Sequence, residues 1–499
     1  MKRLLILVAT LGLLGGAVAQ TITVAQGADA VTLLPQAQED EPLGRTGTAM
    51  YDTLVVQNED LELEPGLAES WEQVDDTTWI FNIRQGVEFH NGEELTADDV
   101  VFTFERLRDP EMASPSAFIV DFIESIEAVD EYTVELNTQY PFAPLLAHLS
   151  HNATSILNEE AVAEAGDDYG TEVAIGTGAF KFVSWQTANQ IVLERNDNWW
   201  GGEVLPEQVI FRPIAEGTVR AIELETGGVD IAYALEPIDS QRLQGGSNPD
   251  VEIVSVETLS TAYLGFNAQQ EPLDDVRVRQ AINYAVDVES IVEAVYMGQA
   301  VPANSPISEA VFGANTDLEP YPYDPERARE LLAEAGLEDG FSTSIWTNDN
   351  QLRIQIAEIV QAQLADVGID AAVEVVEWGT YLAETAAGNH DMFILGWVTV
   401  TGDADYGLYA LFHSSQYGDA GNRTFWSTPR VDELLEIGRT AQTEEERIEA
   451  YHEAQEIIRE EAPWLFLLVT TEDNGIRSNI EGFVPHPAGH HRLFNVWKN

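Results

Sequence analysis

The chain has 499 residues, of which 86 are acidic and 24 are basic, giving a formal net charge of −62 at neutral pH. Charge of this sign repels phosphate backbones and anionic membranes, which argues against nucleic-acid binding. The sequence contains no cysteine, which excludes disulfides, thiolate metal sites, a cysteine nucleophile and a lipid-bearing N-terminal cysteine.

The first 20 residues have the pattern of a secretory signal peptide. Lys2 and Arg3 precede an apolar run over residues 4–18, and Ala17-Val18-Ala19 offers the small side chains that signal peptidase reads. The run is too short and glycine-rich for a comfortable membrane span, although a retained anchor is the alternative. We predict cleavage after Ala19 and a soluble mature protein, periplasmic or extracellular, because no later apolar stretch could cross a bilayer.

The next elements in the chain are a strand and a helix. Residues 78–83 alternate polar and large apolar side chains, as a half-buried strand does. Thr96 and Asp99 have the spacing of a capping box, and Pro110 ends the helix that follows. The apolar residues of this helix share one face: Val100, Val101, Phe104 and Leu107.

Helices and strands continue to alternate in the second half of the chain. The predicted elements are helices over residues 277–286, 288–296 and 354–367, a helix that begins at Asp324-Pro325, and a strand over residues 369–376. This mixture predicts an α/β fold in which helices cover sheets.

Three groups of motifs occur in order along the chain. They occupy residues 65–71, 78–79, 84–92 and 96–100, then 176–182 with 194–196, and then 266–267 with 275–281. Together they resemble the extracellular solute-binding proteins that serve dipeptide, oligopeptide and nickel ABC importers. The resemblance runs from about residue 22 to the C-terminus, which is essentially the whole mature chain.

A fourth region narrows the resemblance to one branch of this family. It contains Gly396-Trp397, residues 401–406, Leu411-Phe412, residues 421–423 and residues 461–464. This region is most similar to the branch described as glutathione-binding. The resemblance implies a binding protein and not an enzyme, with a small peptide, possibly glutathione, as its ligand and no cofactor.

The resemblance also implies a periplasmic-binding-protein type II-like architecture: two lobes joined by a hinge, plus an extra subdomain. We expect interdomain crossings near residues 261–272 and 470–478. The expected limits are residues 20–64, 173–262 and 473–499 for lobe I, 65–172 for the extra subdomain, and 263–472 for lobe II. The lobes would close over the ligand, and the closed monomer would dock on membrane permease subunits.

A zwitterionic peptide needs a buried anion for its ammonium group, since a lone buried charge is costly. Asp403 and Asp405, on a predicted loop after the apolar run 392–397, are the candidates. In dipeptide- and oligopeptide-binding members of the family, an Asp three residues after Gly-Trp holds this ammonium. Here that position is Val400, so Asp403 takes the role or the ligand is held differently.

The carboxylate of such a peptide would suit an arginine fork. Arg353 is the first candidate, with Arg423 and Arg45 as alternatives on predicted loops. Flat aromatic walls suit the rest of a ligand, and Asn267, predicted to lie near the hinge, offers an amide. The aromatic candidates are Trp397, Tyr406, Trp426 and Tyr51.

Three other functions compete with peptide binding. Paired carboxylates can hydrolyse glycosides, but acidic pairs are uninformative in so acidic a chain, and the usual nucleophile, phosphate-loop and HExxH motifs are absent. His486, His490 and His491 could chelate nickel or zinc, although a solvent-exposed turn is the preferred interpretation. Eleven tryptophans would suit an oligosaccharide.

The acidic excess itself predicts a hydrated surface of the kind found in halophilic proteins. High ionic strength would screen the repulsion between its carboxylates. The bulk of these carboxylates is therefore assigned to solubility and not to chemistry.

Overall fold

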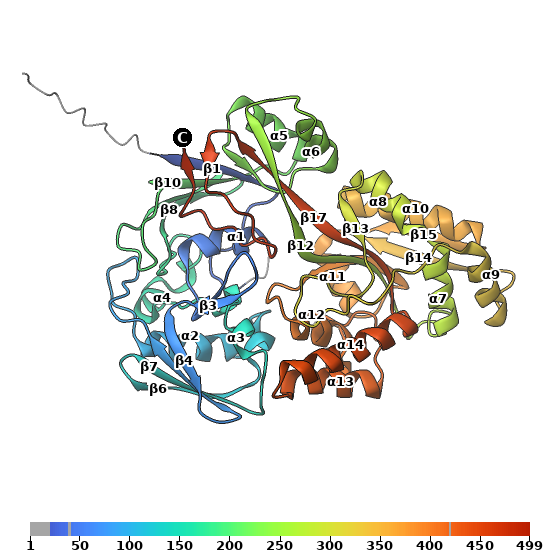
Figure 1. The fold of residues 1–499 in the computed structure, drawn as a ribbon, viewed down its shortest axis with the longest axis horizontal. Helices are drawn as coiled ribbons and strands as arrows, with labels where there is room; N and C mark the ends of the chain where they lie inside the picture. Colours follow the sequence, from blue (N-terminus) through green and yellow to red (C-terminus); the bar gives the residue numbers. More distant parts are fainter. Residues whose placement is uncertain (1–19, 38–40, 419–420) are drawn as a thin grey trace, which may run out of the picture.

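The computed structural model describes residues 20–37, 41–418 and 421–499. The predicted signal peptide and its cleavage site lie outside these ranges. Two lobes lie side by side and are joined by two long strands, β12 (Val251–Phe266) and β17 (Trp464–Arg477) (Figure 1). None of the helices in the described ranges is both long and apolar enough to cross a membrane.

One large sheet runs through both lobes. Its order is β15-β14-β16-β12-β17-β11-β1-β10-β9-β8, with β13 paired to β17. The lobe I strands are β1 (Thr21–Gln26), β8 (Phe180–Gln186), β9 (Gln190–Arg195), β10 (Gln208–Pro213) and β11 (Ile231–Ala232). The lobe II strands are β13 (Ala300–Pro302), β14 (Phe341–Thr347), β15 (Ile369–Val375) and β16 (Met392–Val398).

The connection between the lobes lies inside the β12–β17 ladder. Residues 251–257 pair with 471–477 on the lobe I side, and residues 261–265 pair with 464–469 on the lobe II side. The register breaks between Glu257 and Thr261. The crossing thus lies within two paired strands, and the predicted first crossing begins where this break ends.

An extra subdomain packs on lobe I. Its antiparallel sheet has the order β4-β5-β7-β6, formed by β4 (Ala68–Gln73), β5 (Thr78–Ile83), β6 (Ile123–Asp130) and β7 (Thr133–Thr138). Helix α2 (Ala97–Arg108) covers it and buries Val100, Phe104 and Leu107. The predicted strand and the capping box of Thr96 and Asp99 are both confirmed.

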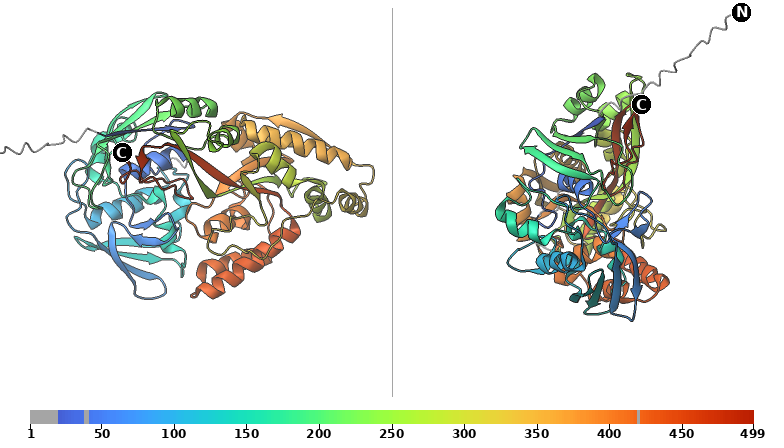
Figure 2. Two further views of the ribbon diagram at one scale, coloured as in Figure 1. Left: turned by 45° about the horizontal axis from the view of Figure 1, so that its top comes forward. Right: turned by 90° about the vertical axis from the view of Figure 1, so that its left-hand side faces the viewer.

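Smaller elements complete this side of the molecule. They are α1 (Glu41–Met50), β2 (Val55–Gln57), β3 (Leu63–Pro65), η1 (Ala117–Val120), α3 (Leu145–His148), η2 (Asn152–Thr154), α4 (Glu159–Ala165), η3 (Gly166–Asp168), α5 (Gly217–Thr226), α6 (Pro237–Gln244), β18 (Ile480–Glu481) and β19 (Trp497–Lys498). The chain end returns beside β1, where Gln20 Nε2 donates to the Lys498 carbonyl at 3.0 Å (Figure 2).

Lobe II carries most of the predicted helices. They are α7 (Val276–Ala285), α8 (Val288–Tyr296), α9 (Pro325–Glu334), α10 (Gln351–Asp366), α11 (Trp378–Ala386), α12 (Ala404–Phe412), α13 (Pro429–Thr440) and α14 (Glu444–Glu461), with the turn η4 (Ser414–Gln416). Asp324 caps α9 as expected, since it accepts from the Arg327 amide at 3.0 Å. Helix α10 begins three residues earlier than predicted, because Asn350 caps it.

Candidate ligand-binding site

The edge of the lobe II sheet that faces lobe I places the loop after β16. Strands β14 and β16 are parallel, with Ile345 beside Met392, so both end at this edge. Ligands of open α/β sheets bind outside the carboxyl ends of such strands. Residues 399–403 follow β16 there, and Thr401 accepts a hydrogen bond from Gln57 of lobe I at 2.9 Å.

Asp403 is held by protein partners on all sides. It is the N-cap of α12 and accepts from the Asp405 amide at 3.0 Å. Both its oxygens lie 2.7 Å from Arg447 Nη2, and the residue is 6% exposed. Although burial alone would lower the pKa of Arg447, Asp403 raises that pKa above its ordinary value. The carboxylate thus anchors α12 to α14.

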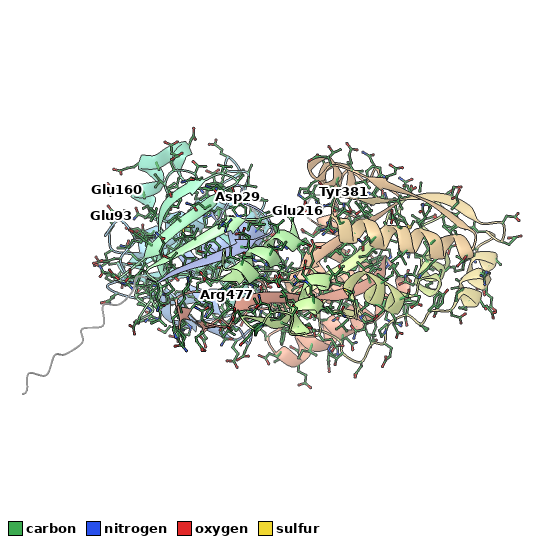
Figure 3. The ribbon with its side chains drawn as sticks, turned by 90° about the horizontal axis from the view of Figure 1, so that it is seen from above. Asp29, Glu93, Glu160, Glu216, Tyr381 and Arg477 are labelled. Carbon is green, nitrogen blue, oxygen red and sulfur yellow. The ribbon has the colours of Figure 1, made fainter. Side chains whose placement is uncertain are left out.

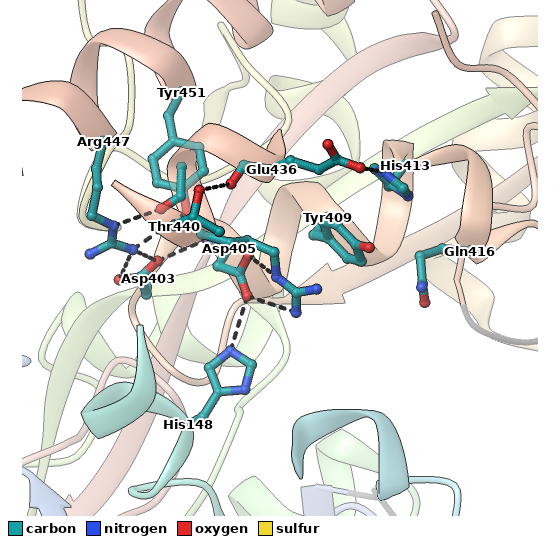
Figure 4. A network of polar contacts seen from close by, with 12 residues as sticks. His148, Asp403, Asp405, Tyr409, His413, Gln416, Glu436, Thr440, Arg447 and Tyr451 are labelled. Atoms are coloured by element: carbon teal, nitrogen blue, oxygen red, sulfur yellow. Dashed lines mark hydrogen bonds and ion pairs between the residues drawn. The ribbon is translucent and has the colours of Figure 1, made fainter. Parts of the chain in front are cut away.

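Asp405 bridges lobe II and the extra subdomain. Its Oδ1 lies 2.8 Å from Arg439 Nε, its Oδ2 lies 3.1 Å from His148 Nε2, and only 1% of the residue is exposed (Figure 4). Although burial alone would raise the pKa of Asp405, Arg439 holds it below its ordinary value. Asp403 and Asp405 were predicted on a loop; they begin a helix instead, because the Asp403 side chain caps its first turn.

Aromatic side chains extend the same contact between lobe II and the extra subdomain. The Tyr406 ring lies 5.8 Å from Phe118, 5.7 Å from His151 and 5.4 Å from Trp397, centroid to centroid. The Ala143 amide also donates to the Arg439 carbonyl at 2.8 Å. Tyr406 therefore lies between the lobes, where its buried ring packs against protein, and Trp397 is half-buried beside it.

Arg353 lies at the start of α10, next to the carboxyl end of β14. Its Nη1 donates to Asn348 at 3.2 Å, and its guanidinium lies 5.9 Å from the Trp378 ring centroid. Within the described ranges no carboxylate lies within ion-pairing distance of it. This leaves its charge uncompensated in a chain rich in acids.

Arg423 lies on the segment that leads to α13. Burial raises the pKa of the Tyr381 phenol, and Arg353 and Arg423 both oppose that rise. Tyr381 itself is buried in the core of lobe II, and its hydroxyl donates to the Ile394 carbonyl at 2.6 Å. Figure 3 views the lobes from above, with Tyr381 labelled in lobe II and Asp29 and Glu216 labelled in lobe I.

Three predicted site residues have structural roles elsewhere. Arg45 is on α1 and not on a loop, and it is buried against Glu472. Asn267 lies beyond the end of β12 that is remote from the crossing, so it is not near the hinge; it donates to the carbonyls of Gly388 and His390. Trp426 belongs to the buried core of lobe II.

A cavity of about 260 Å³ lies beside Val400. Lobe I and the extra subdomain supply the rest of its lining, including Tyr51, which the sequence predicted, and Asp52, which it did not. The Trp199, Trp200 and His490 side chains also line it. No sequence motif identifies these residues as a group, because they come from distant segments.

The C-terminal histidines are predicted from the sequence to lie in an exposed turn, and this prediction is wrong. His486 and His491 are each 2% exposed, since the turn folds back over lobe I and the His491 ring nitrogen Nε2 lies 2.8 Å from Glu472. Across the described part of the chain, no three metal-ligating side chains are arranged to hold an ion.

Comparisons with known proteins agree over nearly the full chain. The family model described as bacterial extracellular solute-binding proteins, family 5, matches residues 62–419. The dipeptide-binding protein of Escherichia coli K12 is 33% identical over 87% of this chain and 86% of its own. The glutathione-binding protein GsiB of Salmonella typhi is 30% identical over 93% of this chain and 92% of its own.

A solved structure agrees equally well with the fold. The periplasmic binding protein DppA of Helicobacter pylori, in complex with the peptide STSA, is 31% identical with a TM-score of 0.86, covering 96% of this chain and 98% of its own. The predicted type II periplasmic-binding-protein architecture and the predicted family are therefore confirmed. The chain belongs to family 5 of the extracellular solute-binding proteins, which serve ABC importers.

Proposed function

We propose that the protein captures a short peptide-like solute between its lobes and presents it, as a monomer, to an ABC permease without catalysing a reaction. The dipeptide-, glutathione- and STSA-binding relatives support this ligand class. Glutathione is the named candidate, in keeping with the motifs over residues 396–412. The main observation is the unpaired Arg353 at the edge of lobe II that faces lobe I.

In this proposal Arg353 pairs with the ligand carboxylate, and Arg423, Trp397 and Tyr51 lie close to the ligand. Asp403 and Asp405 are instead assigned to holding α12, since Arg447 and Arg439 already pair with them. Tyr406 and Asn267 are assigned supporting roles, because the Tyr406 ring packs against protein and Asn267 donates to backbone carbonyls. The domain limits predicted from the sequence are retained as a proposal.

Replacing Arg353 by alanine is expected to weaken the binding of peptides with a free C-terminus by roughly 10- to 150-fold. This range corresponds to the loss of a charged hydrogen bond, about 1.5–3 kcal/mol. Titration calorimetry with a peptide and its C-terminal amide measures the effect, and the variant should bind both forms equally.

The matched control is Arg329→Ala on helix α9, where the exposed arginine donates to the Asp366 carbonyl. This variant should bind like the wild type. An equal loss for the free and amidated peptides in Arg353→Ala would contradict a carboxylate contact.

A thermal-shift screen tests the proposed function directly. It covers glutathione, di- to pentapeptides, cello- and xylo-oligosaccharides and nickel, and a ligand at about 100 times its Kd should add about 2.7 kcal/mol of stability. A shift with glutathione or short peptides is expected. A shift only with sugars or nickel would support those alternatives, and turnover of any peptide or glycoside would contradict a binding role.

Export after cleavage at Ala19, into the periplasm or outside the cell, also belongs to this proposal. The low lysine and arginine content beside 86 acidic residues supports a salty surrounding medium. The screen is therefore run at low and high NaCl, and the ligand-free protein should melt at a higher temperature in high salt because the salt screens its carboxylates.

A further inference from the structure

Asp52 is a half-buried carboxylate that forms no ion pair with the described side chains. Its Oδ2 accepts from Trp200 Nε1 at 2.8 Å and from Thr177 Oγ1 at 2.9 Å. Within the described ranges, no arginine, lysine or histidine nitrogen lies within 4 Å of it. Burial raises the pKa of Asp52, and these two hydrogen bonds and the charge of Arg492 oppose the rise.

Several buried carboxylates of this chain have a cation beside them, whereas buried Asp473 accepts from two serine hydroxyls instead. Arg447 pairs with Asp403, Arg439 with Asp405, and Arg45 with Glu472. Removing an ionised carboxylate from water is costly unless it is paired. Asp52 forms no such ion pair within the described ranges, and it lines the cavity of about 260 Å³ beside Val400.

The walls around Asp52 also suit a cation. Trp199, Trp200 and Tyr51 line the same cavity, and aromatic faces attract cations. Trp200 already has one such partner on its ring, because the Arg84 guanidinium lies 4.6 Å from its centroid. Trp199 lies beside it, with a ring-centroid separation of 5.9 Å.

The charged groups of the lining leave it negative. Asp52 and Glu64 are acidic, and Arg492 is the cation in the lining, where its Nη2 donates to the Gln57 carbonyl at 2.5 Å. Burial lowers the pKa of His486 to about 4 and the pKa of His490 well below its usual range, so both rings are neutral near pH 7. The field of the whole acidic protein adds to the attraction for a cation.

The size and position of the cavity indicate one end of a ligand. Whole-ligand pockets usually enclose about 300–1,000 Å³, and this cavity lies just below that range. Val400 from lobe II contributes to its lining, at the edge that also carries the Arg353 helix. A ligand lying between the lobes could therefore place one end in the cavity.

We propose that Asp52, with Tyr51 and Trp199, binds the ammonium end of the ligand in this cavity. The inference rests on the proposed function, since it assigns the cationic end of the peptide whose carboxylate is assigned to Arg353. Ordered bonds from Trp200 and Thr177 hold the Asp52 carboxylate in place before the ligand arrives.

Calorimetry with Met-Leu and N-acetyl-Met-Leu tests the proposal. The wild type should bind Met-Leu at least 10-fold more tightly than the acetylated form, which lacks the ammonium. Asp52→Asn keeps an acceptor for Trp200 and should weaken Met-Leu binding at least 10-fold while changing acetylated binding less than 3-fold. Glu62→Gln is the matched control, because Glu62 is exposed, lies outside the cavity lining and accepts from Asn58; it should change the affinity for either peptide less than 3-fold.

Equal losses for the two peptides in Asp52→Asn, or equal affinities in the wild type, would overturn the ammonium site while leaving peptide binding intact. The wild-type comparison needs no variant, so a poorly folding Asp52→Asn does not remove the test. A second readout uses choline chloride against equal NaCl in a thermal melt, with the wild type stabilised and Asp52→Asn not. Stabilisation by choline without binding of any peptide would support the ammonium site and overturn the proposed function. If choline does not stabilise the protein and no peptide binds, both the ammonium site and the proposed function are overturned.

Discussion

Asp403→Ala is expected to lower the free energy of unfolding by about 3–5 kcal/mol, because it leaves the guanidinium of Arg447 buried without its carboxylate. The substitution also removes the N-cap of α12, which typically costs about 1 kcal/mol more. Denaturant unfolding at neutral pH and fixed salt measures the loss. The variant should still bind ligand when it is folded.

Arg430 and Glu453 provide the matched control on the neighbouring helices α13 and α14. They form a similar ion pair at 2.7 Å, but both side chains are exposed, so Glu453→Ala should cost less than about 1 kcal/mol. Adding Arg447→Met to Asp403→Ala should recover part of the stability, since the unpaired charge is then removed. A stable Asp403→Ala protein that no longer binds ligand would return Asp403 to the binding site.

The contrast between Asp403 and Asp52 explains what sequence reasoning could reach in the site. Asp403 follows an apolar strand and stands in a loop-like context, which made it the natural anion candidate. Its partner Arg447 comes 44 residues later, so the pairing is invisible until α14 folds against α12. Asp52, in contrast, has no sequence context that marks it as a site residue. It becomes part of a cavity wall only because Trp200 and Val400, which are distant in the chain, fold beside it.

Local elements were more accessible, because their signals are local. The strand Thr78–Ile83 and the capping box of Thr96 depend on alternation and short spacings, and both were predicted correctly. The interlobe crossing was harder to place, since β12 looks like an ordinary strand and its register break at Glu257 depends on pairing with β17. The prediction of an exposed turn at His486 was wrong, because the burial of His486 depends on the return of the chain end to lobe I.

Acidification is expected to destabilise the protein from about pH 6.5 downward. Burial lowers the pKa of His151 to about 3 and those of His90 and His390 to about 4, against 6.5 in an exposed ring. As the pH falls, these histidines therefore bind protons in the unfolded chain but stay neutral in the folded protein. The neutral histidines therefore contribute fully to the free energy of unfolding above pH 6.5, and this contribution is lost as the pH falls toward the folded pKa values.

Surface carboxylates do not obscure the onset of this loss. Their ordinary pKa values are near 4, so relief of their repulsion on protonation begins below pH 5. Between pH 6.5 and 5 the histidines dominate, and each contributes a slope of roughly 1.4 kcal/mol per pH unit at most. Denaturant unfolding of the wild type at several pH values in this window gives the combined slope.

His151→Asn isolates one of these rings. The wild-type Nδ1 accepts from the Ala153 amide at 3.1 Å, and an asparagine oxygen can take the same bond without titrating. Between pH 6.5 and 5, the free energy of unfolding of this variant should change with pH less steeply than that of the wild type, by roughly 1.4 kcal/mol per pH unit, which corresponds to about one proton. Above pH 7.5 the free energy of unfolding of both proteins should be independent of pH. Identical slopes would mean that the ring is protonated in the folded protein, and the contact of His151 with Tyr406 between the lobes would then have to accommodate a charge.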